Sequence, residues 1–261
     1  MFSSDPYILA VSGKGGVGKT TFTALMVKSL LRHYSKKLLV IDADPAANLA
    51  AILGLPPAPT IGELITRTNK DLAKKPPNYN ASALLEFRLW DEALIEGSTF
   101  DFLAAGHTTG PGCYCPINSV LSHMLDNMKS YYDLIILDMD AGLEHISRNT
   151  TRTINHFLLL TDGSCMGFQT IQRIIELTRE LRHKIKKFSL IGNMIIDVPS
   201  QEQVEALANR LSLPCLGLIP TDESIASMNL RGDSLLNLSL NSAAFQKVDS
   251  IILNLIWADQ F

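Results

Sequence analysis

The sequence predicts an α/β fold in which a doubly wound, mostly parallel sheet carries helices on both faces. Short apolar runs rich in Ile, Leu and Val alternate with segments of helical spacing, as in sheets whose strands are buried on both sides. The 261 residues, 46% hydrophobic and 19% charged, suit one domain that spans residues 1–261. A glycine-rich loop follows the first apolar run, so we expect the ligand at the carboxyl ends of the strands.

The apolar runs and the helical spacing give the order of the elements. The expected strands are Tyr7–Ser12, Lys37–Asp42, Thr99–Ala104, Asp133–Asp138, His156–Thr161, Phe188–Asn193 and Pro214–Ile219. The expected helices are Thr20–His33, Phe168–Ile185, Gln201–Leu211 and Ala243–Trp257, and a further helix from Ile117 whose apolar residues fall on one face. Residues 56–97 contain several prolines and fit the alternation least well, so we expect a helical insertion there rather than a second domain.

Charge and cysteine content exclude several classes of protein. The chain carries 23 basic and 26 acidic residues, a net charge of −3, which argues against a nucleic acid or an anionic membrane as partner. No apolar run reaches the roughly 18 residues of a membrane span. Four cysteines are too few for a disulfide scaffold, and the N-terminus lacks the basic region of a secretory signal. We therefore expect a cytoplasmic protein in which Cys165 and Cys215 pack in the interior.

The loop after the first strand matches the phosphate-binding pattern G-x-x-x-x-G-K-[ST] between a strand and a helix. It reads Gly13-Lys14-Gly15-Gly16-Val17-Gly18-Lys19-Thr20-Thr21. Its glycines let backbone N–H groups turn inward around a phosphate, and the following helix adds the positive end of its dipole. Lys19 is expected to reach the β- and γ-phosphates and the Thr20 hydroxyl to join the Mg²⁺ shell. The pattern predicts a P-loop NTPase.

Lys14 is a second lysine, early in the loop. With it, GKGGVGKTT resembles the deviant phosphate loop of the MinD, ParA and nitrogenase iron-protein ATPases. The resemblance implies that Lys14 reaches across a two-fold axis to the nucleotide of a partner subunit. It therefore implies a homodimer that forms with ATP.

Two carboxylates end the second strand beside the phosphate loop. Asp42 and Asp44 are followed by Pro45, which forces the chain out of the strand. By the same resemblance, Asp44 orients the attacking water while Asp42 lies nearer the loop and the metal. The alternative is that one of them caps the helix that follows.

The fourth strand ends in Asp138 after four apolar residues, the usual form of a strand whose carboxylate holds Mg²⁺ directly or through water. Gly142 supplies flexibility where a switch that senses the γ-phosphate would move. Asp140 belongs either to this switch or to a solvated loop. The pattern gives no role to His145.

The far end of the nucleotide site is expected at two later strand ends. By resemblance, Asn193 contacts the edge of adenine, and Pro220, Thr221 and Asp222 form the loop beside it. Asn193 is followed by Met194 rather than by the lysine of guanine-specific sites, which favours ATP and ADP. Asn193 alone would equally suit a strand-end turn.

A C-x-C pair, Cys113 and Cys115, precedes the helix expected from Ile117. The N-terminus of that helix would lower the pKa of the Cys115 thiol and favour the thiolate. Two sulfurs do not complete a metal site, but a two-fold dimer would bring four together. Four thiolates suit Zn²⁺ or an iron–sulfur cluster when tetrahedral and Ni²⁺ when square planar. A redox pair or two inert loop cysteines are the alternatives, and His107 is either an accessory ligand or an ordinary loop histidine.

The segments GKGGVGKTT, IDADPAANLA, GPGCYCPINSVL and DMDAGLEHISRNT together resemble the CooC-type ATPases, nickel-handling maturation factors of carbon monoxide dehydrogenase, and their relative AcsF of acetyl-CoA synthase. The family pattern has Glu where this chain has Asp140. The resemblance implies that Cys113 and Cys115 of each subunit hold Ni²⁺ at the dimer interface, with Zn²⁺ as a substitute in vitro. It implies ATP-dependent nickel insertion into one of these two client enzymes.

Two other classes of ATPase remain as alternatives. A ParA- or MinD-like positioning ATPase needs a basic DNA-binding face or a basic amphipathic C-terminal helix. The tail 246–261 has one lysine and two aspartates, which favours a packed terminal helix. An iron–sulfur electron-transfer ATPase has its cluster cysteines far apart in sequence, unlike this pair. The insertion 56–97 is expected on the surface that faces a client.

Overall fold

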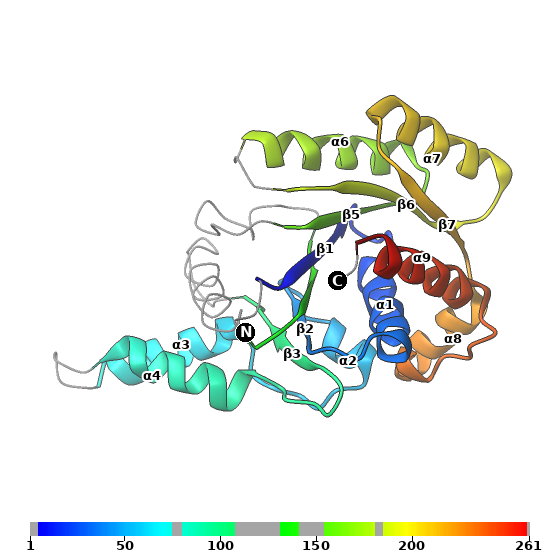
Figure 1. Ribbon diagram of the computed structural model, residues 1–261. Coiled ribbons are helices and arrows are strands. Elements are labelled where there is room, and N and C mark those ends of the chain that lie inside the picture. Colours follow the sequence, from blue (N-terminus) through cyan, green and yellow to red (C-terminus); the bar gives the residue numbers. More distant parts are fainter. Residues whose placement is uncertain (1–4, 75–79, 108–130, 141–153, 181–184, 260–261) are drawn as a thin grey trace.

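The computed structural model describes residues 5–74, 80–107, 131–140, 154–180 and 185–259. Its described residues form one seven-stranded sheet in the order β3-β2-β4-β1-β5-β6-β7. Every pair of neighbouring strands is parallel, so the predicted doubly wound fold is confirmed (Figure 1). The strands are β1 (Tyr7–Gly13), β2 (Leu38–Asp42), β3 (Asp101–Ala104), β4 (Leu134–Asp138), β5 (His156–Thr161), β6 (Phe188–Ile195) and β7 (Cys215–Pro220).

Helices cover both faces of the sheet. In Figure 1, α6 and α7 lie over one face, and α1, α8 and α9 lie over the other. The helices are α1 (Lys19–His33), α2 (Leu49–Leu53), α3 (Ile61–Leu72), α4 (Ala81–Arg88), α6 (Cys165–Glu180), α7 (Val198–Leu211), α8 (Glu223–Arg231) and α9 (Ala243–Asp259), with a π-helix η1 (Leu89–Ala93) and a 3-10 helix η3 (Leu235–Asn237).

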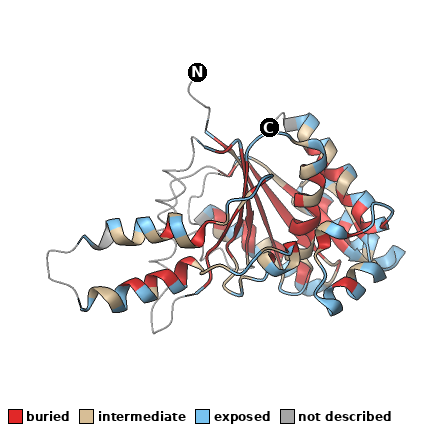
Figure 2. Ribbon diagram, turned by 90° about the horizontal axis from the view of Figure 1, so that it is seen from below, coloured by how far each residue is buried: buried red, intermediate tan, exposed pale blue. Residues whose placement is uncertain are grey.

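The core has two halves, one on each side of the sheet. Along β1, Ile8 and Ala10 pack with α6 and α7, whereas Leu9 and Val11 pack with α1 and α9. Successive side chains of a strand point to opposite faces, so a strand buried on both sides must be apolar throughout. Figure 2 shows the central strands of the sheet buried along their length. This explains why the runs read as continuously apolar.

The strand order reverses at β1, which lies between β4 and β5. In doubly wound sheets, the ligand site lies outside the carboxyl ends of the strands at such a reversal. Here the position holds the phosphate loop. The geometry therefore places the loop beside the ends of β4 and β5, the two neighbours of β1.

The segment 56–97 contains α3, α4 and η1, which extend from the sheet as a helical arm (Figure 1). Thr60 and Glu63 form a capping box that starts α3. Arg88 ties the two helices together, because its guanidinium donates to the Asp71 carboxylate at 2.7 Å and to the Thr68 hydroxyl at 3.1 Å. The outer half of the arm is largely exposed (Figure 2).

The expected interior positions of Cys165 and Cys215 were wrong, and the bounds of some expected elements differ from those in the structure. Cys165 and Cys215 are both exposed, because Cys165 begins α6 and Cys215 begins β7, which is the edge strand of the sheet. The helix expected at Phe168–Ile185 begins earlier, and Ile185 instead forms an isolated parallel bridge with Ile154.

No helix among the described residues is long and apolar enough to cross a membrane. The helix expected from Ile117 lies outside those residues.

Candidate functional site

The phosphate loop connects β1 to α1 in a conformation that requires glycine. A Cβ atom at Gly13 would lie 2.3 Å from the Leu160 carbonyl oxygen of β5. Gly18 has a φ of 81° and precedes α1 without a side-chain cap, and a Cβ there would lie 2.7 Å from the Asn193 side-chain nitrogen. The first N–H groups of α1 therefore stay available for an anion, and the loop is packed against β5 and β6.

Both lysines of the loop are held within the subunit. The Lys19 side chain is 7% exposed, and its Nζ lies 3.4 Å from the Lys14 carbonyl oxygen and 3.9 Å from Asp140 Oδ1. The Lys14 ammonium lies 3.0 Å from Asp162 Oδ2. Asp162 directly follows β5 and was not expected in the site. Its position after an apolar strand is the signal that also marked Asp138.

Asp138 fits the predicted role of Mg²⁺ ligand. It is 1% exposed, and its Oδ1 accepts a hydrogen bond from the Thr23 hydroxyl at 3.0 Å. Its Oδ2 is buried and has no hydrogen-bond partner among the described residues. Burial raises the pKa of Asp138 to about 6, although the Thr20 and Thr23 hydroxyls and the Lys19 ammonium lower it. A buried carboxylate oxygen left without a donor, with the Thr20 hydroxyl nearby, is the donor set that Mg²⁺ prefers.

Asp42 lies beside Asp138, with which it is in register on the neighbouring strand. Its carboxylate is fully buried and accepts hydrogen bonds from the backbone N–H of Asp44 at 3.0 Å and of Leu49 at 2.8 Å. Leu49 is the first residue of α2, so this geometry matches the alternative in which the acid caps the following helix. Burial, with a contribution from Asp138, raises the pKa of Asp42 to about 7.

Asp44 and Asp140 lie at the more open side of the same cluster. The Asp44 carboxylate accepts from the Ala46 N–H at 2.8 Å, and its charge contributes to the raised pKa of Asp138. The Asp140 carbonyl oxygen accepts from the Ser12 hydroxyl at 2.9 Å. The structure therefore brings the phosphate loop and all four acids to one edge of the sheet.

The residues predicted to surround the base also meet. Asn193, Pro220, Thr221 and Asp222 line a cavity of about 300 Å³. Gly18, Thr21 and Phe22 line it too and connect it to the phosphate loop. The Asn193 side-chain N–H donates to the Val17 carbonyl oxygen at 2.8 Å, so the end of β6 is tied to the loop.

The Asp222 carboxylate organises the wall of this cavity. It accepts from the Ser224 N–H at 2.9 Å and the Ser242 hydroxyl at 2.6 Å, and from the Ser224 hydroxyl and the Ala244 N–H. These donors hold the pKa of Asp222 down at about 2 despite burial. Asp222 thus caps α8 and joins it to the start of α9.

The predicted metal-binding pair, Cys113 and Cys115, lies outside the described residues, as does His145. His107 is exposed and borders a hollow formed with Pro57, Pro59 and the α3 side chains Arg67 and Lys70. Within the described part of the chain, no group of three His, Cys, Asp or Glu side chains could hold a metal ion.

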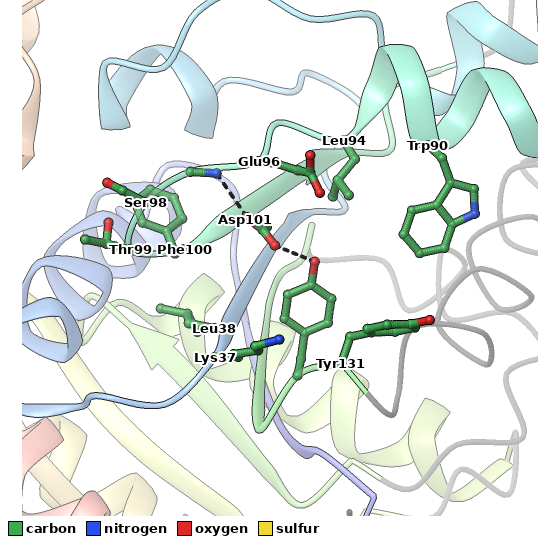
Figure 3. A pocket seen from close by; sticks show the side chains of 12 residues that line it. Lys37, Leu38, Trp90, Leu94, Glu96, Ser98, Thr99, Phe100, Asp101 and Tyr131 are labelled. Carbon is green, nitrogen blue, oxygen red and sulfur yellow. Dashed lines mark hydrogen bonds between the residues drawn. The ribbon is translucent and has the colours of Figure 1, made fainter.

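A larger hollow of about 550 Å³ lies at the opposite end of the sheet, where β2, β3 and β4 begin (Figure 3). Trp90, Tyr131 and Glu96 line it, together with Asp101, which accepts a hydrogen bond from the Tyr132 hydroxyl at 2.6 Å. This hollow does not belong to the nucleotide site, because the phosphate loop lies at the carboxyl ends of the strands.

Known proteins resemble this chain in sequence and in fold. A family model described as the CobQ/CobB/MinD/ParA nucleotide binding domain matches residues 8–235. The chain is 36% identical over 251 residues to an uncharacterised ATP-binding protein of Methanocaldococcus jannaschii, covering 95% of this chain and 98% of that protein. It is 28% identical over 244 residues to the carbon monoxide dehydrogenase accessory protein CooC of Rhodospirillum rubrum, covering 88% and 90%.

The solved structures agree on the fold. A ParA family ATPase from Chlorobium tepidum superposes with a TM-score of 0.72 at 18% identity, over 97% of this chain and all of that one. MinD from Pyrococcus horikoshii, solved with Mg-ADP, superposes with a TM-score of 0.66 at 20% identity, over 96% of each chain. With the family model matching most of its length, this chain belongs to the CobQ/CobB/MinD/ParA nucleotide-binding family and is a P-loop ATPase.

Proposed function

We propose that this ATPase handles nickel during the maturation of a nickel enzyme, either carbon monoxide dehydrogenase or acetyl-CoA synthase. ATP binding would close a two-fold dimer and bring the Cys113 and Cys115 thiolates of both subunits around one Ni²⁺. Hydrolysis would reopen the dimer and release the metal to the client. The observation that carries the proposal is the C-x-C pair in a chain related over 88% of its length to a carbon monoxide dehydrogenase accessory protein.

The nucleotide chemistry is assigned to residues that lie together in the structure. Backbone N–H groups of the phosphate loop and the Lys19 ammonium bind the β- and γ-phosphates. The Thr20 hydroxyl and the Asp138 carboxylate would hold Mg²⁺, which supplies positive charge against the phosphate oxygens. Asp44, at the open side of the acid cluster, orients the attacking water. The cavity lined by Asn193 takes the adenine.

Two-fold symmetry supports the metal half of the proposal. Proteins of this family form ATP-dependent dimers. An isologous interface brings the same patch of each subunit together, so a pair of thiolates that is incomplete in one chain becomes a set of four. Lys14, placed across the same axis, would couple the occupancy of the nucleotide site to the formation of the metal site.

The test measures Ni²⁺ binding by equilibrium dialysis under anaerobic conditions with and without ATP. Replacing both Cys113 and Cys115 by serine is expected to abolish the binding of about one Ni²⁺ per dimer and to leave ATP binding intact. The matched control replaces Cys165 and Cys215 by serine, because both are exposed thiols, and should leave Ni²⁺ binding unchanged. Undiminished nickel binding in the first variant would refute the proposal.

A positioning ATPase is the second candidate, because the chain is also 28% identical over 250 residues to MinD of Synechocystis. The C-terminal helix argues against it. In α9, Val248, Ile251 and Leu255 are buried in the core, and its described residues include a single lysine. The apolar side chains of this helix pack in the core, so they do not form the exposed apolar face with which an amphipathic helix binds a lipid surface. ATP-dependent co-sedimentation with anionic vesicles or duplex DNA would favour this candidate.

An electron-transfer ATPase is the third candidate. It would carry an iron–sulfur cluster between the subunits and would show brown absorbance after anaerobic purification. Protein that is colourless as purified under anaerobic conditions and then binds added nickel would exclude it.

A further inference from the structure

Lys14, which in the proposed function contacts the nucleotide of the partner subunit, forms an ion pair within its own subunit. The Lys14 Nζ lies 3.0 Å from Asp162 Oδ2, and the two side chains are 34% and 26% exposed. The contact follows from the strand order, because β1 pairs with β5 and Gly13 is in register with Leu160. The start of the phosphate loop therefore lies beside the end of β5.

The carboxylate of Asp162 is held in place on its other side. Its Oδ1 accepts hydrogen bonds from the Ser164 N–H at 3.1 Å and from the Ser164 hydroxyl at 2.6 Å. These bonds and the Lys14 ammonium keep the pKa of Asp162 low despite partial burial. A carboxylate anchored through Oδ1 keeps Oδ2 directed at Lys14 and cannot follow the lysine toward another subunit.

Lys14 also receives the other lysine of the loop. The Lys19 Nζ donates to the Lys14 carbonyl oxygen at 3.4 Å. A triphosphate bound in the loop attracts the Lys19 ammonium and so competes with this contact. Nucleotide binding would therefore weaken a contact to the backbone of Lys14, the residue whose ammonium pairs with Asp162.

We infer that Asp162 is a positioning residue that keeps Lys14 in its own subunit, so that each subunit must give up this ion pair when the dimer forms on ATP. The inference rests on the proposed two-subunit site. Partly exposed ion pairs change an equilibrium by about 1.4- to 5-fold each. Since two such pairs must break per dimer, Asp162 weakens dimerisation by about 2- to 30-fold.

The test compares Asp162→Asn with the wild-type protein by analytical ultracentrifugation in Mg²⁺ and a non-hydrolysable ATP analogue. The variant is expected to dimerise about 2- to 30-fold more tightly. Ser164→Ala is the matched control: it removes the hydroxyl hydrogen bond that Asp162 Oδ1 accepts but leaves the charge that faces Lys14. It should lower thermal stability and leave the dimer constant within about twofold. Unchanged or weaker dimerisation of folded Asp162→Asn would overturn the inference.

A second measurement separates failure of this inference from failure of the proposed function. In ¹⁵N NMR of the nucleotide-free monomer, the Lys14 ammonium should give an exchange-protected signal that is identified by its loss in Lys14→Ala. Asp162→Asn should abolish that signal, whereas Ser164→Ala should keep it. If the wild-type protein does not dimerise at all with the ATP analogue, the proposed function fails. A Lys14 signal unaffected by Asp162→Asn overturns the ion-pair inference whether or not the dimer forms.

Discussion

Replacing Asp138 by asparagine should stabilise the metal-free protein while removing its Mg²⁺-dependent function. Burial raises the pKa of Asp138 from its usual 3.8 to about 6. The folded state therefore disfavours the charged carboxylate. Each pKa unit between the folded and unfolded chain corresponds to about 1.4 kcal/mol, so ionised Asp138 lowers the free energy of unfolding by about 3 kcal/mol at pH 8.

The Asp138→Asn variant recovers only part of this loss in the free energy of unfolding. Asparagine can still accept the Thr23 hydroxyl hydrogen bond through Oδ1. Its amide, however, occupies the buried position where Oδ2 has no partner among the described residues. An orphaned neutral group costs about 1–3 kcal/mol, which leaves a net gain of up to about 2 kcal/mol at pH 8.

The stability difference between Asp138→Asn and the wild type should depend on pH. Because the folded pKa is raised, the cost of ionisation is absent below the unfolded pKa, near 4, and grows as the pH rises to about 6. Urea unfolding without Mg²⁺ should therefore show the variant more stable at pH 8 and about equal to the wild type at pH 5. Asp133→Asn is the control, because Asp133 is exposed just before β4 and the hydrogen bond that its side chain accepts from the Lys37 N–H at 3.0 Å can be kept by the asparagine oxygen. It should change stability by less than about 0.5 kcal/mol at either pH. If Asp138→Asn is less stable than the wild type at pH 8, burial of the ionised Asp138 carboxylate does not destabilise the metal-free protein, and the reasoning is wrong.

Three further outcomes are expected from the same site. Mg²⁺-dependent ATP binding should weaken as the pH falls below about 6, because protonation of Asp138 removes a ligand oxygen; calorimetry from pH 5 to 8 measures this, and a flat profile would contradict it. Asn193→Ala should weaken ATP binding by about tenfold, because it removes a polar side chain from the cavity assigned to the adenine. Tripolyphosphate does not reach that cavity and should lose less affinity, so equal losses for both ligands would refute a role at the base end. Asp222→Ala should lower the free energy of unfolding by about 1–2 kcal/mol, since it strips the cap of α8; an unchanged melting temperature would argue against this role.

The sequence predicted what depends on local pattern. Asp138 was found because four apolar residues precede it on a strand that must be buried, and the phosphate loop because its glycines and lysine have fixed spacing. The exposed Cys215 was misjudged because an apolar run does not reveal whether its strand lies at the edge of the sheet. That depends on the strand order, which places β7 last.

Long-range pairing accounts for the other differences. Asp162 meets Lys14 only because β5 lies next to β1, although the two residues are 148 positions apart. Asp222 takes a hydrogen bond from Ser242, which is 20 residues further along the chain. Asp42 joins the start of α2, a helix of five residues that is too short to leave a periodic signal.

The most direct test of the account is an anaerobic titration of the protein with Ni²⁺, with and without a non-hydrolysable ATP analogue, read by absorbance and by molecular mass. If two subunits share one nickel site, the absorbance of Ni²⁺–thiolate bonding saturates at about one ion per two chains, and the molecular mass doubles over the same range. Nickel that binds one ion per chain without a change in mass, or an ATP-bound dimer that takes up no nickel, would contradict it.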